Sequence, residues 1–181
     1  MPGPATHGDA GRPGGGPAVV LALDVGEARI GLARGELGAT FAFGRGALRR
    51  TGRQADDVAA VAAAAATEGA SLVVVGLPLR AQGGDSAQTR RVRSFAGALG
   101  AAGLQVELVD ERFTTALAQR QVAGAELPRG KRQAKARLDE AAAVAILETY
   151  LARRAAAVAS RDAASDDAAA APGARDEAAR P

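Results

Sequence analysis

Short apolar runs alternate along the chain with polar or Ala-rich segments, and the first part of this pattern predicts three strands. The run AVVLALDVG at 18–26 is β-branched, apolar and closed by Gly, which is typical of a buried strand. RIGLARGE at 29–36 alternates apolar and polar positions after a tight turn, so it predicts a second strand paired with the first. TFAFGRGALRR at 40–50 places Phe41 and Phe43 two positions apart and predicts a third strand of the same meander.

The second part of the pattern predicts strands separated by helices. QADDVAAVAAAAATEG at 54–69 is dense in Ala and ends in Gly, which indicates a helix with a Gly C-cap. SLVVVGLPL at 71–79 is the most apolar short run and predicts a central parallel strand buried on both faces. A helix is expected after Ser86, a candidate N-cap, and QVELVDER at 105–112 predicts the fifth strand.

The last part of the folded chain predicts two further helices. One is expected from Thr114 or Thr115, followed by a polar, basic linker, and the last spans 138–154 and is apolar over most of its circumference. A three-stranded meander followed by strands that alternate with helices is the order of an α/β fold. The sequence therefore predicts a mixed five-stranded sheet with helices on both faces.

Composition limits the folded domain to the middle of the chain. Ten of the first seventeen residues are Gly or Pro, and residues 155–181 are low-complexity Ala, Asp and Arg, so we expect 1–17 and 155–181 to be disordered. Residues 18–154 are expected to form one domain. The N-terminal extension lacks the pattern of a secretory signal, and the chain has no long apolar stretch, so a soluble, cytoplasmic protein is expected.

Acidic residues fall at the ends of predicted elements. Asp24 ends the first strand, Asp110 and Glu111 end the last strand, and Asp139 opens the final helix. The ends of strands in an α/β sheet converge at one edge, so the acids of the first and last strands become neighbours if those strands are adjacent. A helix N-terminus laid across the same edge would bring Asp139 alongside.

Such a group of carboxylates favours metal-assisted hydrolysis. Clustered carboxylates repel one another unless cations lie between them, and hard oxygen ligands suit Mg²⁺ or Mn²⁺. Two such ions about 3.5–4 Å apart can activate a water and stabilise the leaving oxygen of a phosphodiester. The chain has no Cys, and its single His, His7, lies in the N-terminal extension, so schemes based on a thiol or an imidazole are disfavoured.

Each acid also has an ordinary structural interpretation. Asp24 precedes Gly26 by two positions and is compatible with turn chemistry alone. The Asp110–Glu111 pair could lead into a helix and form a surface ion pair, and Asp139 could be an N-cap or first-turn acid. The order and placement of all the acids together favour the metal site.

The charge of the chain favours a polyanionic partner. Residues 18–154 carry 19 basic and 14 acidic side chains, a net charge of +5, against +3 for the whole chain. The segment PRGKRQAKAR at 128–137 holds five basic residues and no acid directly before Asp139, so we expect it to bind nucleic-acid phosphates rather than to be only a solvated loop. The candidate contacts in this segment are Arg129, Lys131, Arg132, Lys135 and Arg137.

Four stretches resemble the YqgF family, also called RuvX. They are LALDVGEARIGLA, VVVGLPL, VELVDERFTT and RLDEAAAVAILETYL, which occur in family order over residues 20 to 151. The resemblance implies an RNase H-like fold, similar to that of Holliday-junction resolvases. It also implies a metal-dependent nuclease (a hydrolase of phosphodiester bonds) in 5′-end maturation of pre-16S rRNA, and so a role in ribosome biogenesis. The long Gly/Pro-rich and Ala/Asp-rich ends depart from the family pattern.

The resemblance also implies roles for individual residues. Asp24 matches the acid of the first strand and Asp139 the acid of the final helix, and the middle carboxylate falls on the DER motif, where Asp110 and Glu111 both remain candidates. We expect Asp24, Asp110, Glu111 and Asp139 as catalytic residues, with Asp24, Asp110 and Asp139 as metal ligands. Arg112 would contact phosphate or carboxylate, unless it is only a surface arginine.

Three other functions are compatible with these residues to different degrees. A resolvase acting on branched DNA needs a dimer to cut two strands, whereas an rRNA nuclease can be a monomer or a homodimer. An actin-like or sugar-kinase ATPase needs two such domains, which this length cannot supply. A non-catalytic RNA-binding factor, alone or on ribosomal particles, would keep the fold without cleavage.

Overall fold

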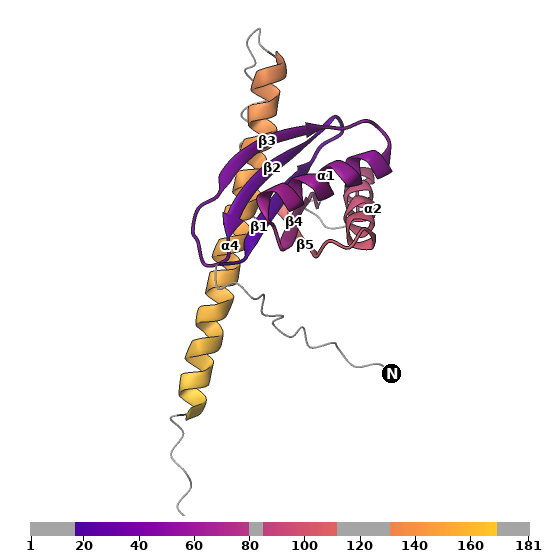
Figure 1. Ribbon diagram of the computed structural model, residues 1–181. Helices are drawn as coiled ribbons and strands as arrows, with labels where there is room; N and C mark the ends of the chain where they lie inside the picture. The colour runs from indigo at the N-terminus through magenta and orange to yellow at the C-terminus, as the bar shows by residue number, and fades with distance from the viewer. Residues whose placement is uncertain (1–16, 80–84, 112–130, 170–181) are drawn as a thin grey trace, which may run out of the picture.

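The computed structural model describes residues 17–79, 85–111 and 131–169, and these residues form one α/β domain (Figure 1). The predicted sequence of strands and helices is confirmed wherever these residues cover it. The helix expected from Thr114 or Thr115 lies outside them, as do most of the N-terminal extension and the end of the C-terminal tail. The elements are β1 (Val19–Val25), β2 (Arg29–Glu36), β3 (Phe43–Arg49), α1 (Gln54–Glu68), β4 (Leu72–Leu77), α2 (Ala87–Ala101), β5 (Val106–Asp110) and α4 (Lys131–Ala169).

The five strands form one mixed sheet in the order β3-β2-β1-β4-β5. Strands β1, β2 and β3 are antiparallel neighbours, while β4 is parallel to both β1 and β5. The predicted meander, the central parallel strand and the mixed five-stranded sheet are therefore confirmed. Strand β4 separates β1 from β5, so the first and last strands are not adjacent.

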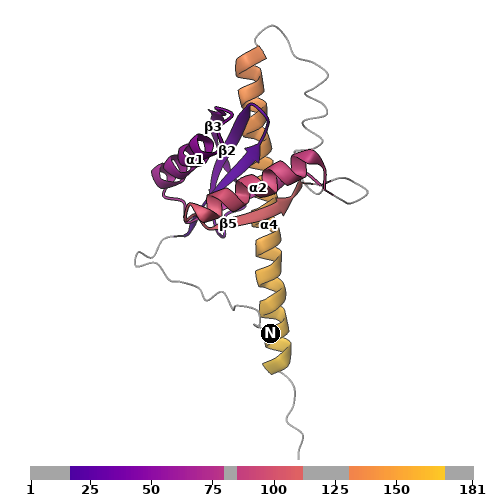
Figure 2. The same cartoon turned by 90° about the vertical axis from the view of Figure 1, so that its right-hand side faces the viewer.

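The two central strands, β1 and β4, are buried on both faces, as predicted for the run at 71–79. Leu21 and Leu23 of β1 pack with α1 and α2, whereas Val20 and Ala22 pack with α4 on the other face. Figures 1 and 2 show α4 crossing one face and α1 and α2 covering the other. Because alternate residues of a strand point to opposite faces, burial on both sides explains why β1 and β4 are almost continuously apolar.

The caps of α1 and α2 also follow the sequence. Gly69 ends α1 in the left-handed conformation, with φ of 66° and ψ of 27°, which glycine adopts without steric cost. Ser86 caps α2 by accepting a hydrogen bond from the Thr89 N–H, and the Thr89 side chain accepts one from the Ser86 N–H. This reciprocal pair fixes where α2 begins, at the edge of the sheet where β4 ends.

Helix α4 is longer than predicted at both ends. It begins at Lys131 rather than Leu138, so most of the expected basic linker is helical, and it continues to Ala169, so the expected disorder from residue 155 is wrong over 155–169. Ala has the strongest intrinsic helix preference, and no Gly or Pro occurs between Lys131 and Ala169. The helix therefore extends beyond the sheet at both ends (Figures 1 and 2).

The two phenylalanines near the start of β3 are not core residues. Phe41 and Phe43 are 59% and 53% exposed, and their rings meet edge to face with centroids 5.6 Å apart. The spacing of the two phenylalanines predicted a strand, and this strand, β3, lies at the edge of the sheet. Helices α1 and α2 pack over β1, β4 and β5 rather than over this end of β3.

Among the residues described, no helix is long and apolar enough to cross a membrane.

Asp57 ties the start of α1 to the end of β3. Its carboxylate accepts hydrogen bonds from Arg50 Nε at 2.8 Å and from the Thr51 N–H at 2.9 Å, and the residue is 3% exposed. Burial by itself raises the pKa of Asp57, but these hydrogen bonds and the Arg50 charge outweigh it and hold the pKa below its ordinary value of 3.8.

We expect Asp57→Asn to lower the free energy of unfolding by about 2 kcal/mol at pH 7, because a charge-assisted hydrogen-bond pair is lost. A lowered pKa stabilises the fold above the unfolded pKa, and the effect disappears as the pH falls through the folded pKa. Urea unfolding at pH 7 and below pH 3.8 measures this difference, which should shrink in acid. The exposed neighbour provides the control, since Asp56→Asn should change stability little. An equal difference at both pH values would contradict the assignment.

Candidate active site

Asp24 lies near the end of β1, with its side chain on the face covered by α4. Its neighbours Val20 and Ala22 belong to the core under α4, so alternation along the strand places Asp24 on the same side. The residue is 6% exposed and is in register with Gly31 of β2. A buried carboxylate here is consistent with the prediction that Asp24 does more than shape a turn.

Gly31 allows the backbone of α4 to lie directly on the sheet beside Asp24. A Cβ atom at this position would lie well inside 3.0 Å of the backbone carbonyl of Asp139. Any side chain at Gly31 would therefore push α4 away from β2. The close approach explains how Asp139 comes beside the end of β1.

Glu111 reaches the same face from the other side of the sheet. It follows β5 directly and is 3% exposed. A Cβ at Gly76 of β4 would collide with the Glu111 carboxylate and with Ile146 of α4. Because Leu23 is in register with Val75, Gly76 lies beside Asp24. The Glu111 side chain thus lies over β4. It reaches the side of Asp24 although β1 and β5 are not adjacent, which the sequence analysis had required.

Asp110 is placed differently from Glu111. It is in register with Leu77, which belongs to the core under α1 and α2, whereas the preceding Val109 belongs to the core under α4. Alternation therefore directs Asp110 to the face opposite Asp24. Of the two candidates in the DER motif, the structure brings Glu111, and not Asp110, to the side of Asp24 and Asp139.

Asp139 lies well inside α4, which begins at Lys131. The expectation that it opens the final helix is wrong, and an N-cap or first-turn role is excluded by its position. Its Oδ2 atom lies 4.0 Å from Nη1 of Arg29. The position of Asp139 is set by the contact of α4 with Gly31 rather than by a helix terminus.

The three acids Asp24, Glu111 and Asp139 thus gather around the glycine pair, Gly31 and Gly76. The donors are carboxylate oxygens, which suit hard divalent cations, and the missing Cβ atoms leave the space that the acids and α4 occupy. Within the described ranges, no three acidic side chains are already close enough to form a complete metal-binding group. The oxygen donors fit a divalent metal in their chemistry, and the three carboxylates would need to move closer together to hold one.

Arg29 is a site residue that the sequence analysis did not single out. It begins β2, two residues before Gly31, and its Nη1 atom is buried without a hydrogen-bond acceptor among the residues described here. It also stands directly opposite Arg49 of β3, a like-charge pair that costs stability. Counting alternate residues back from Gly31 would have placed Arg29 on the face of the acids.

The predicted nucleic-acid contacts are only partly covered by the structure. Arg112 and Arg129 lie outside the described residues. Lys131, Arg132 and Lys135 belong to the first turns of α4, but their side chains are not described. Arg137 is exposed.

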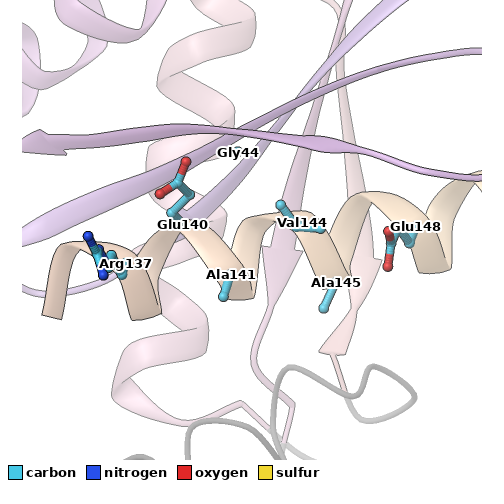
Figure 3. A pocket seen from close by; sticks show the side chains of 7 residues that line it. All are labelled: Gly44, Arg137, Glu140, Ala141, Val144, Ala145 and Glu148. Atoms are coloured by element: carbon cyan, nitrogen blue, oxygen red, sulfur yellow. The ribbon is translucent and has the colours of Figure 1, made fainter. Parts of the chain in front are cut away.

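Arg137 also lines a shallow pocket of about 330 Å³ between α4 and β3. In Figure 3, Glu140 points from α4 toward Gly44, and its Oε1 atom accepts a hydrogen bond from the Gly46 N–H at 3.1 Å. The lining includes neither Asp24 nor Glu111. The pocket therefore marks the seam between α4 and the edge strand rather than the site of the acids.

Comparison with known proteins places the chain among nucleases. Residues 18–153 match the model of a family described as "RuvX: Holliday junction resolvase". A Thermus thermophilus protein named "Putative pre-16S rRNA nuclease" is 52% identical over 134 residues, which cover 74% of this chain and 97% of that protein. A Deinococcus radiodurans protein named "Ribonuclease YqgF" is 43% identical, over 74% of this chain and 88% of its own length.

A solved structure of T. thermophilus RuvC in complex with a Holliday junction substrate is also similar. It has 20% sequence identity and a TM-score of 0.46, and the match covers 76% of this chain and 96% of that one.

Proposed function

The chain belongs to the RuvX family, and on that premise we propose that it is a metal-dependent nuclease that matures the 5′ end of pre-16S rRNA. The observation that carries the proposal is the convergence of Asp24, Glu111 and Asp139 on the glycine pair. Two relatives named as RNA nucleases, at 52% and 43% identity, support RNA as the substrate. The enzyme is a hydrolase of phosphodiester bonds, and its macromolecular partner is nucleic acid.

We propose that Asp24, Glu111 and Asp139 hold the divalent metal, with Mg²⁺ or Mn²⁺ suited to their oxygen donors. When bound, the metal supplies an activated water and stabilisation of the leaving oxygen. The chain itself provides the placement. Packing under α4 buries Asp24 and Glu111 and limits the access of bulk water. The close contact of the α4 backbone with Gly31 fixes the position of Asp139.

Arg29 has a separate role in this proposal. Its Nη1 atom lies 4.0 Å from Oδ2 of Asp139 and has no hydrogen-bond acceptor among the residues described. We assign this N–H group to a phosphate oxygen of the substrate. A guanidinium beside the acids would offset the repulsion between the RNA phosphate and the carboxylates. The basic segment 128–137 and Arg112 remain candidate RNA contacts on the approach to the site.

The two acids of the DER motif should respond differently to the same chemical change. We expect Glu111→Gln to lower the rate of RNA cleavage at least about a hundredfold, because it removes a charge that faces the metal. Asp110→Asn is the matched control and should retain cleavage within a few fold, since its side chain lies on the opposite face. Single-turnover cleavage at saturating Mg²⁺ measures both. A larger loss of cleavage in Asp110→Asn than in Glu111→Gln would assign the metal ligand of the DER motif to Asp110 and contradict the placement of the two side chains described above.

One rival function has a specific observation in its favour, because the matching family is described as a Holliday junction resolvase. Such an enzyme would act as a dimer on branched DNA. For the RNA nuclease, we propose a monomer or homodimer that works in the cytoplasm on a precursor RNA or a ribosomal particle. A non-catalytic RNA-binding factor is the weaker alternative, since the acids of the site are present.

A further inference from the structure

A basic groove lies between α1 and α2, on the face of the sheet opposite α4. It has a volume of about 430 Å³, and three arginines, Arg50, Arg90 and Arg91, line it together with polar Gln54 and Ser94. Helix α2 begins in its wall, at Ala87, so the positive end of the helix dipole adds to the potential there. We define the basic groove by these three arginines.

The groove is attached to the turn that directly follows Asp24. Arg50 Nη1 donates to the carbonyl of Gly26 at 3.0 Å, and Gln88 of α2 donates to the carbonyl of Val25 at 2.9 Å. Arg91 Nη1 lies 3.2 Å from Oε1 of Glu27. The groove and the acids thus lie at the same end of β1, on opposite faces of the sheet. A nucleic-acid strand that passes from the acids over the β1–β2 turn therefore reaches the groove next.

The charges in the groove are only partly balanced. Arg50 is fixed by the buried carboxylate of Asp57. Arg90 donates to the backbone carbonyl of Asp85, and among the residues described no carboxylate forms an ion pair with it. The partner of Arg91 is Glu27, and both side chains are mostly exposed, at 64% and 82%. Exposed pairs of this kind contribute little, so Arg91 can exchange Glu27 for a phosphate.

The groove offers contacts to a backbone rather than to bases. The aromatic residue in its wall, Phe95, is 2% exposed, and the Arg50 guanidinium lies over its ring at 5.5 Å from the centroid. No base can stack on a face that is already covered. Guanidinium groups without a neutralising partner bind phosphate oxygens well.

We propose that the basic groove binds the phosphate backbone of the RNA strand that continues beyond the cleavage site, over the β1–β2 turn and onto α2. The proposal rests on the proposed function, because it assumes that the scissile phosphate lies at the acids. It assigns Arg90 and Arg91 as substrate-binding residues that contact the RNA backbone without reading its sequence. It also gives the chain a second basic surface, independent of the segment 128–137.

The test compares two double variants of the full chain with equal charge. R90Q/R91Q removes two groove cations, and R153Q/R161Q removes two exposed cations of α4 as the control. Affinity for a fluorescent single-stranded RNA is measured in EDTA over a range of salt concentrations. We expect R90Q/R91Q to bind about tenfold more weakly at low salt and to lower the salt slope by about 1.4, since each single-strand phosphate contact contributes about 0.7. The control should change affinity less than about twofold.

Several outcomes would overturn the proposal. An unchanged slope in R90Q/R91Q, or equal losses in both double variants, would show that the groove does not contact RNA. Unchanged RNA affinity with weaker binding of polyglutamate would show that it takes an acidic protein instead. Binding in EDTA does not depend on cleavage, so the two proposals can fail separately. If only R90Q/R91Q loses RNA affinity and the wild-type protein cleaves no RNA, the groove binds RNA but the proposed nuclease function is wrong. Circular dichroism checks that each variant is folded.

Discussion

Asp24→Asn is expected to reduce RNA cleavage by about a thousandfold or more, which corresponds to about 4 kcal/mol of lost transition-state stabilisation. The substitution keeps the shape of the side chain and removes one negative oxygen donor from a site that we assign to a divalent metal. The fold should be preserved, because the loss of one of several neighbouring carboxylates relieves repulsion when metal is absent.

The metal role of Asp24 has a readout besides activity. Mg²⁺ or Mn²⁺ should raise the melting temperature of the wild-type protein and should raise that of Asp24→Asn much less, since binding to the native state stabilises it. Asp85→Asn is the matched control, with the same change at a side chain that is 41% exposed before α2. Wild-type cleavage and an undiminished metal shift in Asp24→Asn would exclude the metal role.

The second large effect is expected at Gly31. Adding one methyl group in Gly31→Ala would place it against the backbone carbonyl of Asp139, and backbone cannot move aside as a flexible side chain can. We expect the free energy of unfolding to fall by about 3 kcal/mol and cleavage to fall with it, because α4 and Asp139 must shift. Urea unfolding and single-turnover cleavage measure the two effects.

Gly97 of α2 provides the control for Gly31. A Cβ there meets no atom within 4 Å, so Gly97→Ala should stabilise the protein by up to about 1 kcal/mol through helix propensity and leave cleavage unchanged. Normal stability and activity in Gly31→Ala would mean that α4 does not lie on β2 in the way described. The same reasoning applies to Gly76, where Glu111 and Ile146 occupy the space.

Most of the fold could be predicted from local pattern. The apolar runs of β1 and β4 have no polar face, which is typical of strands buried on both sides, and Gly69 and Ser86 carry recognisable cap chemistry. The predicted C-terminal boundary of the fold was wrong, because low-complexity composition and helix propensity point to different structures for the same residues. Low complexity indicated disorder after residue 154, but Ala preference extends α4 to Ala169.

The candidate site was harder to predict than the fold. The sequence indicated that Asp24 and Asp139 belong together, but it left Asp110 and Glu111 open because their placement depends on which face of β5 each one takes. A glycine inside an apolar strand marks a close approach by another group. Gly31 and Gly76 were that signal. The glycines, rather than the acids, indicate where α4 and Glu111 come to lie.

The measurement that tests the central claim most directly is cleavage of a 16S rRNA precursor fragment beside a four-way DNA junction. Both substrates are incubated with Mg²⁺ and with Mn²⁺, using the wild-type protein and Asp24→Asn. We predict metal-dependent cleavage of the precursor by the wild-type protein and none by the variant. Cleavage of the junction alone, or binding of the precursor without cleavage under every condition, would contradict an rRNA maturation nuclease.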